Sequence, residues 1–238
     1  MANSYFQFKQ FLIRQDRCAM KLSTDAILLG ALAQHPGPKQ ILDIGAGTGV
    51  IGLMLAQRFP DAEVHGVEIE QAAFTQASEN IQQSPWKERM KLFHLPFQVY
   101  AKNSNQKYDL IASNPPYFAN HLKSKDPGRN WALHDDQLSL TDLVKGVNRA
   151  LGKEGSFWLI LPGTEMKRFA ELALHSDLHR SVRYQIYDRP ERPPHREICC
   201  FRKSVLPNSH SLGICLKDTA GQYSQAYRKL LHDFLLDR

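Results

Sequence analysis

The four residues Asn114-Pro115-Pro116-Tyr117 follow an apolar stretch and combine an amide, a rigid turn and an aromatic ring. Each proline fixes its own φ and pushes the residue before it toward extended geometry, so the turn is stiff. The Asn114 side-chain oxygen and the Pro115 carbonyl can therefore accept both protons of one planar ring amine, while the Tyr117 ring lies against the ring face. Taken alone, these residues are explained equally well by a proline turn that only closes a strand.

A second set of residues able to bind a ligand lies upstream, where residues 41–49 read ILDIGAGTG. A short apolar strand runs into glycines at alternate positions, Gly45, Gly47 and Gly49, and a helical pattern follows. Glycine permits positive φ and close approach of a ligand, and the start of a helix offers free N–H groups. Glu68 ends the next apolar run, where its carboxylate can accept hydrogen bonds from a ribose diol. These residues predict a nucleoside-binding half-site.

Two cofactors compete for this half-site. The glycines within residues 47–52, with Glu68 further along the chain, formally satisfy the fingerprint of dinucleotide-binding folds. The glycine run begins earlier, however, at Gly45, and Asp43 precedes it. An acid near the ligand suits a cationic amino-acid group better than a pyrophosphate. The whole pattern, from Asp43 through Glu68 to the Asn114 turn, resembles the class I S-adenosylmethionine-dependent methyltransferases.

This resemblance implies transfer of a methyl group from S-adenosylmethionine to an amino or amide nitrogen. The sulfonium methyl needs no further activation, so the enzyme's task is alignment for an in-line displacement. The lone pair of a ring amine is delocalised into the ring. Hydrogen bonds from the amine to Asn114 Oδ1 and the Pro115 carbonyl would favour a pyramidal nitrogen and stabilise its growing positive charge. Pro116 and Tyr117 would bind the base, which must leave any structured nucleic acid to reach them.

Composition limits the class of protein. The chain has 238 residues, of which 42% are apolar and 23% charged, so we expect one α/β domain over residues 1–238. No apolar run is long enough for a membrane span, and residues 1–10 lack an apolar signal core. We therefore expect a cytoplasmic protein with no membrane partner, and a monomer. The four cysteines, Cys18, Cys199, Cys200 and Cys215, lack metal-ligand spacing, so no metal is expected.

The basic charge of the chain, +6 with an isoelectric point near 9.1, is compatible with a nucleic-acid partner. Basic residues cluster near the amino terminus, after the Asn114 turn and in a proline-rich stretch. Each basic cluster taken alone is explained as a solvent-exposed surface. Three such clusters around one predicted site favour RNA as the partner. The residues expected to contact RNA are Lys123, Lys125, Arg129, Arg192 and Arg196. Residues 118–136 are predicted to form a substrate loop, in which Trp131 offers a stacking platform.

Alternating strands and helices must position these residues. Strands are predicted at 40–44, 64–67, 90–94, 108–112 and 156–161, and helices at 23–32, 50–58, 71–83 and 141–151. This alternation is typical of a doubly wound, mostly parallel sheet. The tail over 181–215 is strand-rich, and residues 223–236 form an amphipathic pattern. We predict a seven-stranded sheet with an amino-terminal hairpin within residues 1–22, made of strands 5–13 and 18–22, and a carboxy-terminal helix.

The chain as a whole resembles one family, the bacterial tRNA1(Val) adenine-N6 methyltransferases, which modify the adenine beside the anticodon at tRNA position 37. Residues 20–26, reading MKLSTDA, match the segment of that family that precedes the glycine loop. The resemblance implies that Lys21, Thr24 and Asp25 line the methionine end of the cofactor, that Glu68 binds its ribose, and that Asn114 also lies in the cofactor site. It implies S-adenosylmethionine as cofactor, a Rossmann-like fold and tRNA as the partner.

One stretch departs from the methyltransferase pattern. Residues 94–98 read HLPFQ, where these enzymes usually carry an acid that contacts the cofactor's adenine amine. We therefore assign no residue to that contact.

Rival functions use the same catalytic turn. In a protein glutamine-N5 methyltransferase the acceptor is an amide nitrogen, whose lone pair is also delocalised. Such enzymes, however, carry a helical substrate domain before the glycine loop. A guanine-N2 rRNA methyltransferase usually has Phe in place of Tyr117 and a second domain. A catalytically silent RNA-binding module is a third alternative, against which the intact Asp43, Glu68 and Asn114 argue.

Overall fold

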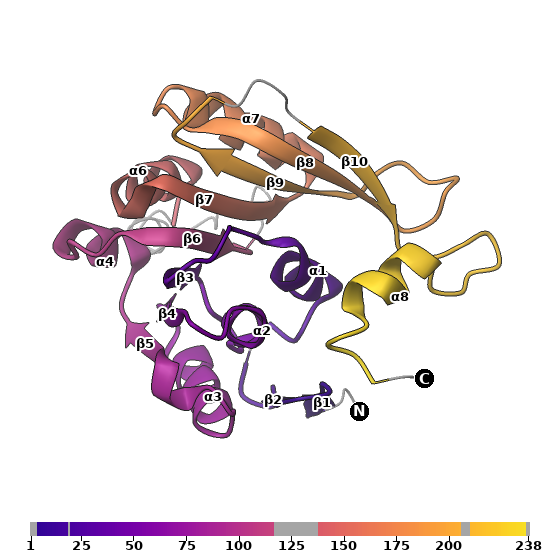
Figure 1. Ribbon diagram of the computed structural model, residues 1–238, viewed down its shortest axis with the longest axis horizontal. Helices are drawn as coiled ribbons and strands as arrows, with labels where there is room; N and C mark the ends of the chain where they lie inside the picture. Colours follow the sequence, from indigo (N-terminus) through magenta and orange to yellow (C-terminus); the bar gives the residue numbers. More distant parts are fainter. Residues whose placement is uncertain (1–3, 19, 117–137, 206–209, 237–238) are drawn as a thin grey trace, which may run out of the picture.

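Buried apolar runs form the strands of one mixed sheet, which carries the site (Figure 1). The computed structural model describes residues 4–18, 20–116, 138–205 and 210–236. Eight strands lie in the order β10-β8-β9-β7-β6-β3-β4-β5. In chain order they are β3 (Gln40–Ile44), β4 (Glu63–Glu68), β5 (Met90–His94), β6 (Tyr108–Ser113), β7 (Leu151–Leu161), β8 (His179–Tyr187), β9 (Arg196–Arg202) and β10 (His210–Cys215).

Helices cover both faces of the sheet, as expected for a doubly wound fold (Figure 1). One face carries α1 (Thr24–Leu32), α2 (Val50–Arg58), α3 (Gln71–Gln82) and α8 (Gln225–Leu231), which share one apolar core. The other face carries α4 (Phe97–Asn103), α6 (Leu140–Ala150) and α7 (Gly163–Leu174), which pack around a second core. A short 3-10 helix, η1, spans Lys87–Arg89. In the described part of the chain, no helix is long and apolar enough to cross a membrane.

The amino-terminal hairpin exists but is shorter than predicted. Its strands are β1 (Tyr5–Gln7) and β2 (Leu12–Arg14), so both lie within the first predicted strand. The turn closes through a hydrogen bond from Phe8 N to Phe11 O at 2.9 Å, and the two phenyl rings stack at 4.3 Å. The predicted strand over residues 18–22 is wrong. The described residues of that stretch form no strand, and Leu22 N instead donates to Gln15 Oε1 at 2.8 Å.

The sheet follows the predicted order of elements, with one strand more than the seven expected. That strand, β10, pairs in parallel with β8 at the outer edge of the sheet. The strands predicted at 40–44 and 90–94 have the predicted bounds, whereas β7 begins at Leu151, earlier than expected. Helices α4 and α7 were not predicted, and α8 is shorter than the predicted pattern over residues 223–236.

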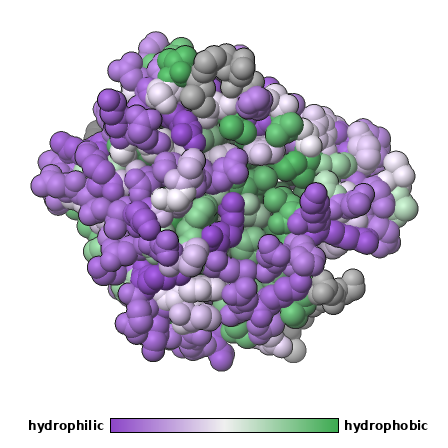
Figure 2. Space-filling model, in the orientation of Figure 1, coloured by the Kyte–Doolittle hydropathy of each residue, from purple (hydrophilic) through white to green (hydrophobic). Residues whose placement is uncertain are grey.

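Side-chain hydrogen bonds hold the helix ends in place on the α1 face. Ser23 caps α1 by accepting from Ala26 N at 3.2 Å. Arg58 donates to Gly30 O at 2.9 Å, at the carboxyl end of α1, and Arg89 donates to Ala56 O at 2.8 Å on α2. The space-filling view shows a largely hydrophilic surface, with apolar side chains gathered in the region of α1, β10 and α8 (Figure 2).

Candidate functional site

The carboxyl ends of three parallel strands form the edge on which the predicted site residues lie. Ile44 of β3 is paired with Val67 of β4 on one side and with Ser113 of β6 on the other. Ser113, which is fully buried, donates its hydroxyl to Ile44 O at 3.0 Å. The next residues, Gly45 and Asn114, therefore leave the sheet side by side, at the spacing of neighbouring strands.

The glycine loop turns tightly because three of its residues have positive φ. Gly45, Gly47 and Gly49 have φ values of 73°, 56° and 82°, a conformation that a side chain would strain. Gly45 N and Ala46 N both donate to Val67 O, at 2.9 and 3.1 Å. The loop therefore folds back over the end of β4 and then enters α2.

The Glu68 carboxylate holds this loop at its centre. Its Oε2 accepts a hydrogen bond from Gly47 N at 2.8 Å, and its Oε1 accepts one from Glu70 N at 2.8 Å. The side chain is nearly buried, at 7% exposure. Each carboxylate oxygen has a second lone pair, so Glu68 can still accept from the hydroxyls of a ribose.

Asp43 is a buried acid beneath the glycine loop. Its Oδ2 accepts from Gly52 N at 3.0 Å, while its buried Oδ1 has no partner among the described residues. Burial raises the pKa of Asp43 from 3.8 to about 7, the Gly52 N–H opposes this, and the charge of Glu68 adds to it. An uncompensated acid of this kind is stabilised by a nearby cation.

The arrangement fits S-adenosylmethionine. A Cβ placed on Gly45 would meet no protein atom within 4 Å, so the loop presents an open backbone surface. Glu68 offers acceptors to a ribose at the end of β4. Asp43 lies close by with an unpartnered oxygen and would stabilise a cationic amino-acid group.

The described residues from the end of β2 into α1, 14–18 and 20–25, form a segment that we call the strap. The sequence predicted a strand over residues 18–22 of it. Asn80 of α3, only 1% exposed, fixes its beginning. Arg14 N donates to Asn80 Oδ1, and Asn80 Nδ2 donates to Arg14 O, both at 2.9 Å. The same Nδ2 donates to Thr48 O of the glycine loop at 2.9 Å. One amide therefore ties the strap, α3 and the loop together.

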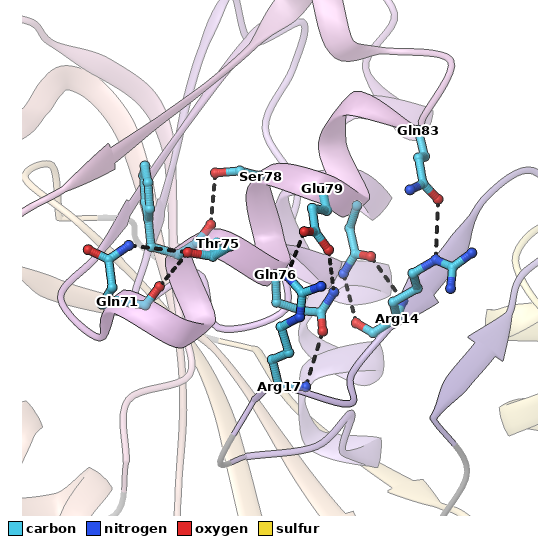
Figure 3. A network of polar contacts seen from close by, with 10 residues as sticks. Arg14, Arg17, Gln71, Thr75, Gln76, Ser78, Glu79 and Gln83 are labelled. Atoms are coloured by element: carbon cyan, nitrogen blue, oxygen red, sulfur yellow. Dashed lines mark hydrogen bonds and ion pairs between the residues drawn. The ribbon is translucent and has the colours of Figure 1, made fainter.

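Further polar contacts along α3 continue this attachment (Figure 3). Arg17 N donates to Oε1 of the fully buried Gln76 at 3.2 Å, and the Arg17 side chain pairs with Glu79 at 2.6 Å. Burial raises the pKa of Cys18 to about 11, with smaller contributions from the charges of Glu70, Glu68 and Asp16. The strap is thus attached to α3 by Arg17 as well as by Arg14.

The far end of the strap contains the residues predicted to line the methionine end of the cofactor. Lys21 and Thr24 are exposed, and Thr24 is the first residue of α1. Asp25 is paired with Arg196, whose Nε lies 2.8 Å from Asp25 Oδ2. Sequence reasoning gave these two residues separate roles, one on the cofactor and one on RNA. The structure brings them together.

Only part of the predicted catalytic turn lies in the described residues. Asn114 is half-buried, Pro115 is buried and Pro116 is exposed. Tyr117 lies outside the described residues, as do Lys123, Lys125, Arg129 and Trp131 of the predicted substrate loop. Arg192 is exposed in the loop between β8 and β9.

No local sequence pattern marks the residues that support the site. Asn80 and Gln76 read as ordinary polar positions of a helix, and Ser113 reads as a strand end. In the stretch that lacks an acid, Leu95 N donates to Glu68 O at 3.2 Å, and Phe97 begins α4. Among the described residues, no cluster of His, Cys, Asp or Glu could hold a metal ion.

Comparisons with known proteins agree with this geometry. Residues 23–167 match the family model "Methyltransferase small domain". A Bacteroides thetaiotaomicron protein named tRNA1(Val) (adenine(37)-N6)-methyltransferase is 40% identical over 99% of both chains. An Escherichia fergusonii protein of the same name is 39% identical over 97% of this chain and 94% of its own. The chain belongs to this methyltransferase family. Its cofactor is S-adenosylmethionine.

Solved structures share the fold of this methyltransferase at low identity. A structure described as a predicted O-methyltransferase from Agrobacterium tumefaciens aligns with a TM-score of 0.65 and 17% identity, covering 90% of this chain and 99% of its own. A ribosomal protein L11 methylase from Lactobacillus delbrueckii aligns with a TM-score of 0.55 and 14% identity, covering 76% and 78%. At these identities the likeness concerns the fold alone.

Replacing Asp43 with Asn tests the buried charge. The variant keeps an acceptor for Gly52 N and removes the ionisation. Because the pKa of Asp43 is raised from 3.8 to about 7 in the folded state, wild-type stability falls as pH rises through this window. At pH 8 we expect Asp43→Asn to be more stable than the wild type by up to about 4 kcal/mol, and near pH 4 the difference should vanish. Urea unfolding at both pH values measures this, and a pH-independent difference would contradict it.

Replacing Asn80 with Ala tests the attachment of the strap. The change leaves Arg14 and Thr48 backbone groups without their buried partner, which costs roughly 1–3 kcal/mol. We expect the affinity for S-adenosylhomocysteine to fall roughly tenfold, because both the glycine loop and the strap lose their fixed position. Calorimetric titration at a temperature where the variant is folded measures the affinity.

A matched control is Asn148→Ala. Asn148 of α6 donates to Ser176 O at 2.8 Å, on the opposite face of the sheet. It should lose stability while keeping cofactor affinity. Equal loss of affinity in the two variants would mean that Asn80 acts only through global stability.

Proposed function

We propose that this methyltransferase transfers a methyl group from S-adenosylmethionine to the N6 amine of adenine 37 in tRNA1(Val). Its relatives at about 40% identity over nearly their whole length carry this activity in their names. The observation that carries the proposal is the position of Asn114, which leaves β6 beside Gly45 of the cofactor loop. An amine held by Asn114 therefore lies next to the methyl donor.

The chain's own residues supply alignment and charge stabilisation. The bound cofactor supplies an activated methyl group. Asn114 Oδ1 and the Pro115 carbonyl accept the two amine protons and orient the nitrogen lone pair. Because positive charge grows on that nitrogen during attack, two fixed oxygens stabilise the transition state more than the ground state. No described residue hydrogen-bonds with the Asn114 side chain, so its amide is available to a substrate.

Binding of RNA is assigned to residues around this edge. Tyr117 stacks on the flipped adenine, and Lys123, Lys125, Arg129 and Trp131 of the 118–136 loop contact the surrounding RNA. Arg192 lies in the loop that follows β8, a strand parallel to β6 and β7. That loop therefore reaches the same edge of the sheet as Asn114.

The names of the relatives favour a tRNA adenine methyltransferase over a protein glutamine methyltransferase. In the described residues, only the β1–β2 hairpin and α1 precede β3. Both pack on the methyltransferase core, in the cluster that contains Phe8, Ile13 and Leu28. Neither forms a separate substrate domain.

Product identification tests the proposal. The protein is incubated with labelled S-adenosylmethionine and, separately, with unmodified tRNA1(Val) transcript, ribosomal RNA or a release factor. We expect N6-methyladenosine from the tRNA alone, and its loss from a transcript carrying guanine at position 37. Methylguanosine from ribosomal RNA or methylglutamine from the release factor would overturn the assignment while keeping the cofactor.

Replacing Asn114 with Ala tests the catalytic turn. The variant loses one of the two oxygens that orient the amine, so turnover should fall by at least about 100-fold. Affinity for S-adenosylhomocysteine should change by no more than about threefold, because the glycine loop and Glu68 remain. Single-turnover methylation and calorimetry separate the two effects. Near-normal turnover would show that Asn114 does not hold the reacting amine.

A further inference from the structure

The Asp25–Arg196 ion pair joins the end of the strap to the sheet. Arg196 Nε donates to Asp25 Oδ2 at 2.8 Å, and the two side chains are only 25% and 14% exposed. Arg196 begins β9, and Asp25 lies in the first turn of α1. The pair therefore links two elements that are far apart in the sequence.

Arg196 lies at the same edge of the sheet as Asn114. Its neighbour Glu197 pairs with Leu161, the last residue of β7, and β7 pairs with β6 through Ser113 and Leu159. Because β9 is antiparallel to β7, the beginning of β9 lies where β7 ends. Asp25 is thereby held at the edge that carries the glycine loop and the catalytic turn.

The strap turns back on itself before it enters α1. Leu22 N donates to Gln15 Oε1 at 2.8 Å, so the described residues at the two ends of this turn lie together. Gln15 N donates to Ser4 O at 2.8 Å, which ties the turn to the hairpin. Asp25 follows the turn and lies against the start of β9. The strap is therefore attached to the hairpin and α3 at one end and to β9 at the other.

The pair is poorly explained as a device for stability alone. Two charges that lose most of their water gain little net free energy from each other. The start of α1 already has a cap, because Ser23 accepts from Ala26 N. Arg196 also lies on the opposite face from its neighbour Glu197, which pairs with Arg183 beside α7.

We infer that Arg196 is a positioning residue for the cofactor site, acting through Asp25 as the far anchor of the strap. Asn80 fixes the other end of the strap, at Arg14. With the strap fixed at both ends, the start of α1 is held at the sheet edge that carries the glycine loop and Asn114. The inference rests on the proposed function, since it takes this edge as the cofactor site. It gives Arg196 a role on the cofactor in place of the RNA contact that the sequence predicts.

Cofactor titration without RNA tests the inference. We expect Arg196→Ala to weaken S-adenosylhomocysteine binding roughly tenfold and Arg196→Lys to recover part of the loss, because a lysine keeps the charge but not the planar fork. The matched control is Arg183→Ala. It breaks the pair between Arg183 of β8 and Glu197 of β9, whose side chains are 34% and 10% exposed and lie on the face away from Asp25. It should lower the melting temperature similarly and leave cofactor affinity unchanged.

A double-mutant cycle shows whether Arg196 acts through Asp25. If it does, Asp25→Asn combined with Arg196→Ala weakens cofactor binding little more than either change alone. Additive losses would overturn the coupling.

Measuring RNA binding by these variants distinguishes the inferred cofactor role of Arg196 from the RNA contact that the sequence predicts. Arg192→Ala should weaken tRNA binding and leave cofactor affinity intact. If Arg196→Ala behaves like Arg192→Ala, with normal cofactor affinity and weaker RNA binding, the inference fails and the RNA contact stands. If the wild-type protein binds no S-adenosylhomocysteine, the proposed function fails and this inference with it.

Discussion

The Glu68 carboxylate is the interaction on which the site depends. It accepts a backbone N–H from the glycine loop with one oxygen and a second from Glu70 with the other. The loop can reach it only because its alternate glycines have positive φ, and because Gly45 and Ala46 bond back to the end of β4. A single acid therefore fixes the shape of the loop and still offers lone pairs to a ligand. Substituting it would remove both backbone hydrogen bonds at once.

The site also depends on the position of the strap, which is fixed by the buried side-chain amides of Asn80 and Gln76. Asn80 makes the contacts with Arg14 that a neighbouring strand would make, using one donor and one acceptor for one residue's backbone. Arg14, the last residue of β2, is thereby held between Tyr5 of β1 and α3. The same amide bonds to Thr48, so the strap and the glycine loop share one support. Because buried polar groups are costly when left unpaired, the arrangement favours one geometry over others of similar compactness.

The sequence was informative where local rules apply. Alternating apolar runs and glycine spacing predicted β3, α2, β4 and the place of Glu68, because strand and helix periods and positive-φ glycines are local properties. It failed for the hairpin, because the apolar residues from Tyr5 to Ile13 hide a turn that is closed by stacking of Phe8 on Phe11. It gave no sign of the contacts that Asn80 and Arg196 make. Their partners, Thr48 and Asp25, are distant in the sequence, and no local pattern distinguishes these side chains from solvent-exposed ones.

The two acids of the site carry an energetic consequence for the enzyme as a whole. Asp43 is buried with a raised pKa and lies in the field of Glu68, so the protein without its ligand holds an ionised acid at a cost near neutral pH. A ligand with a cationic amino-acid group and a sulfonium centre relieves that cost. Binding free energy and folding free energy are then coupled, because a ligand that binds only the folded state stabilises it. In the proposed role of Asp43, the acid that weakens the empty fold is thus the group that would favour a cationic cofactor over a pyrophosphate.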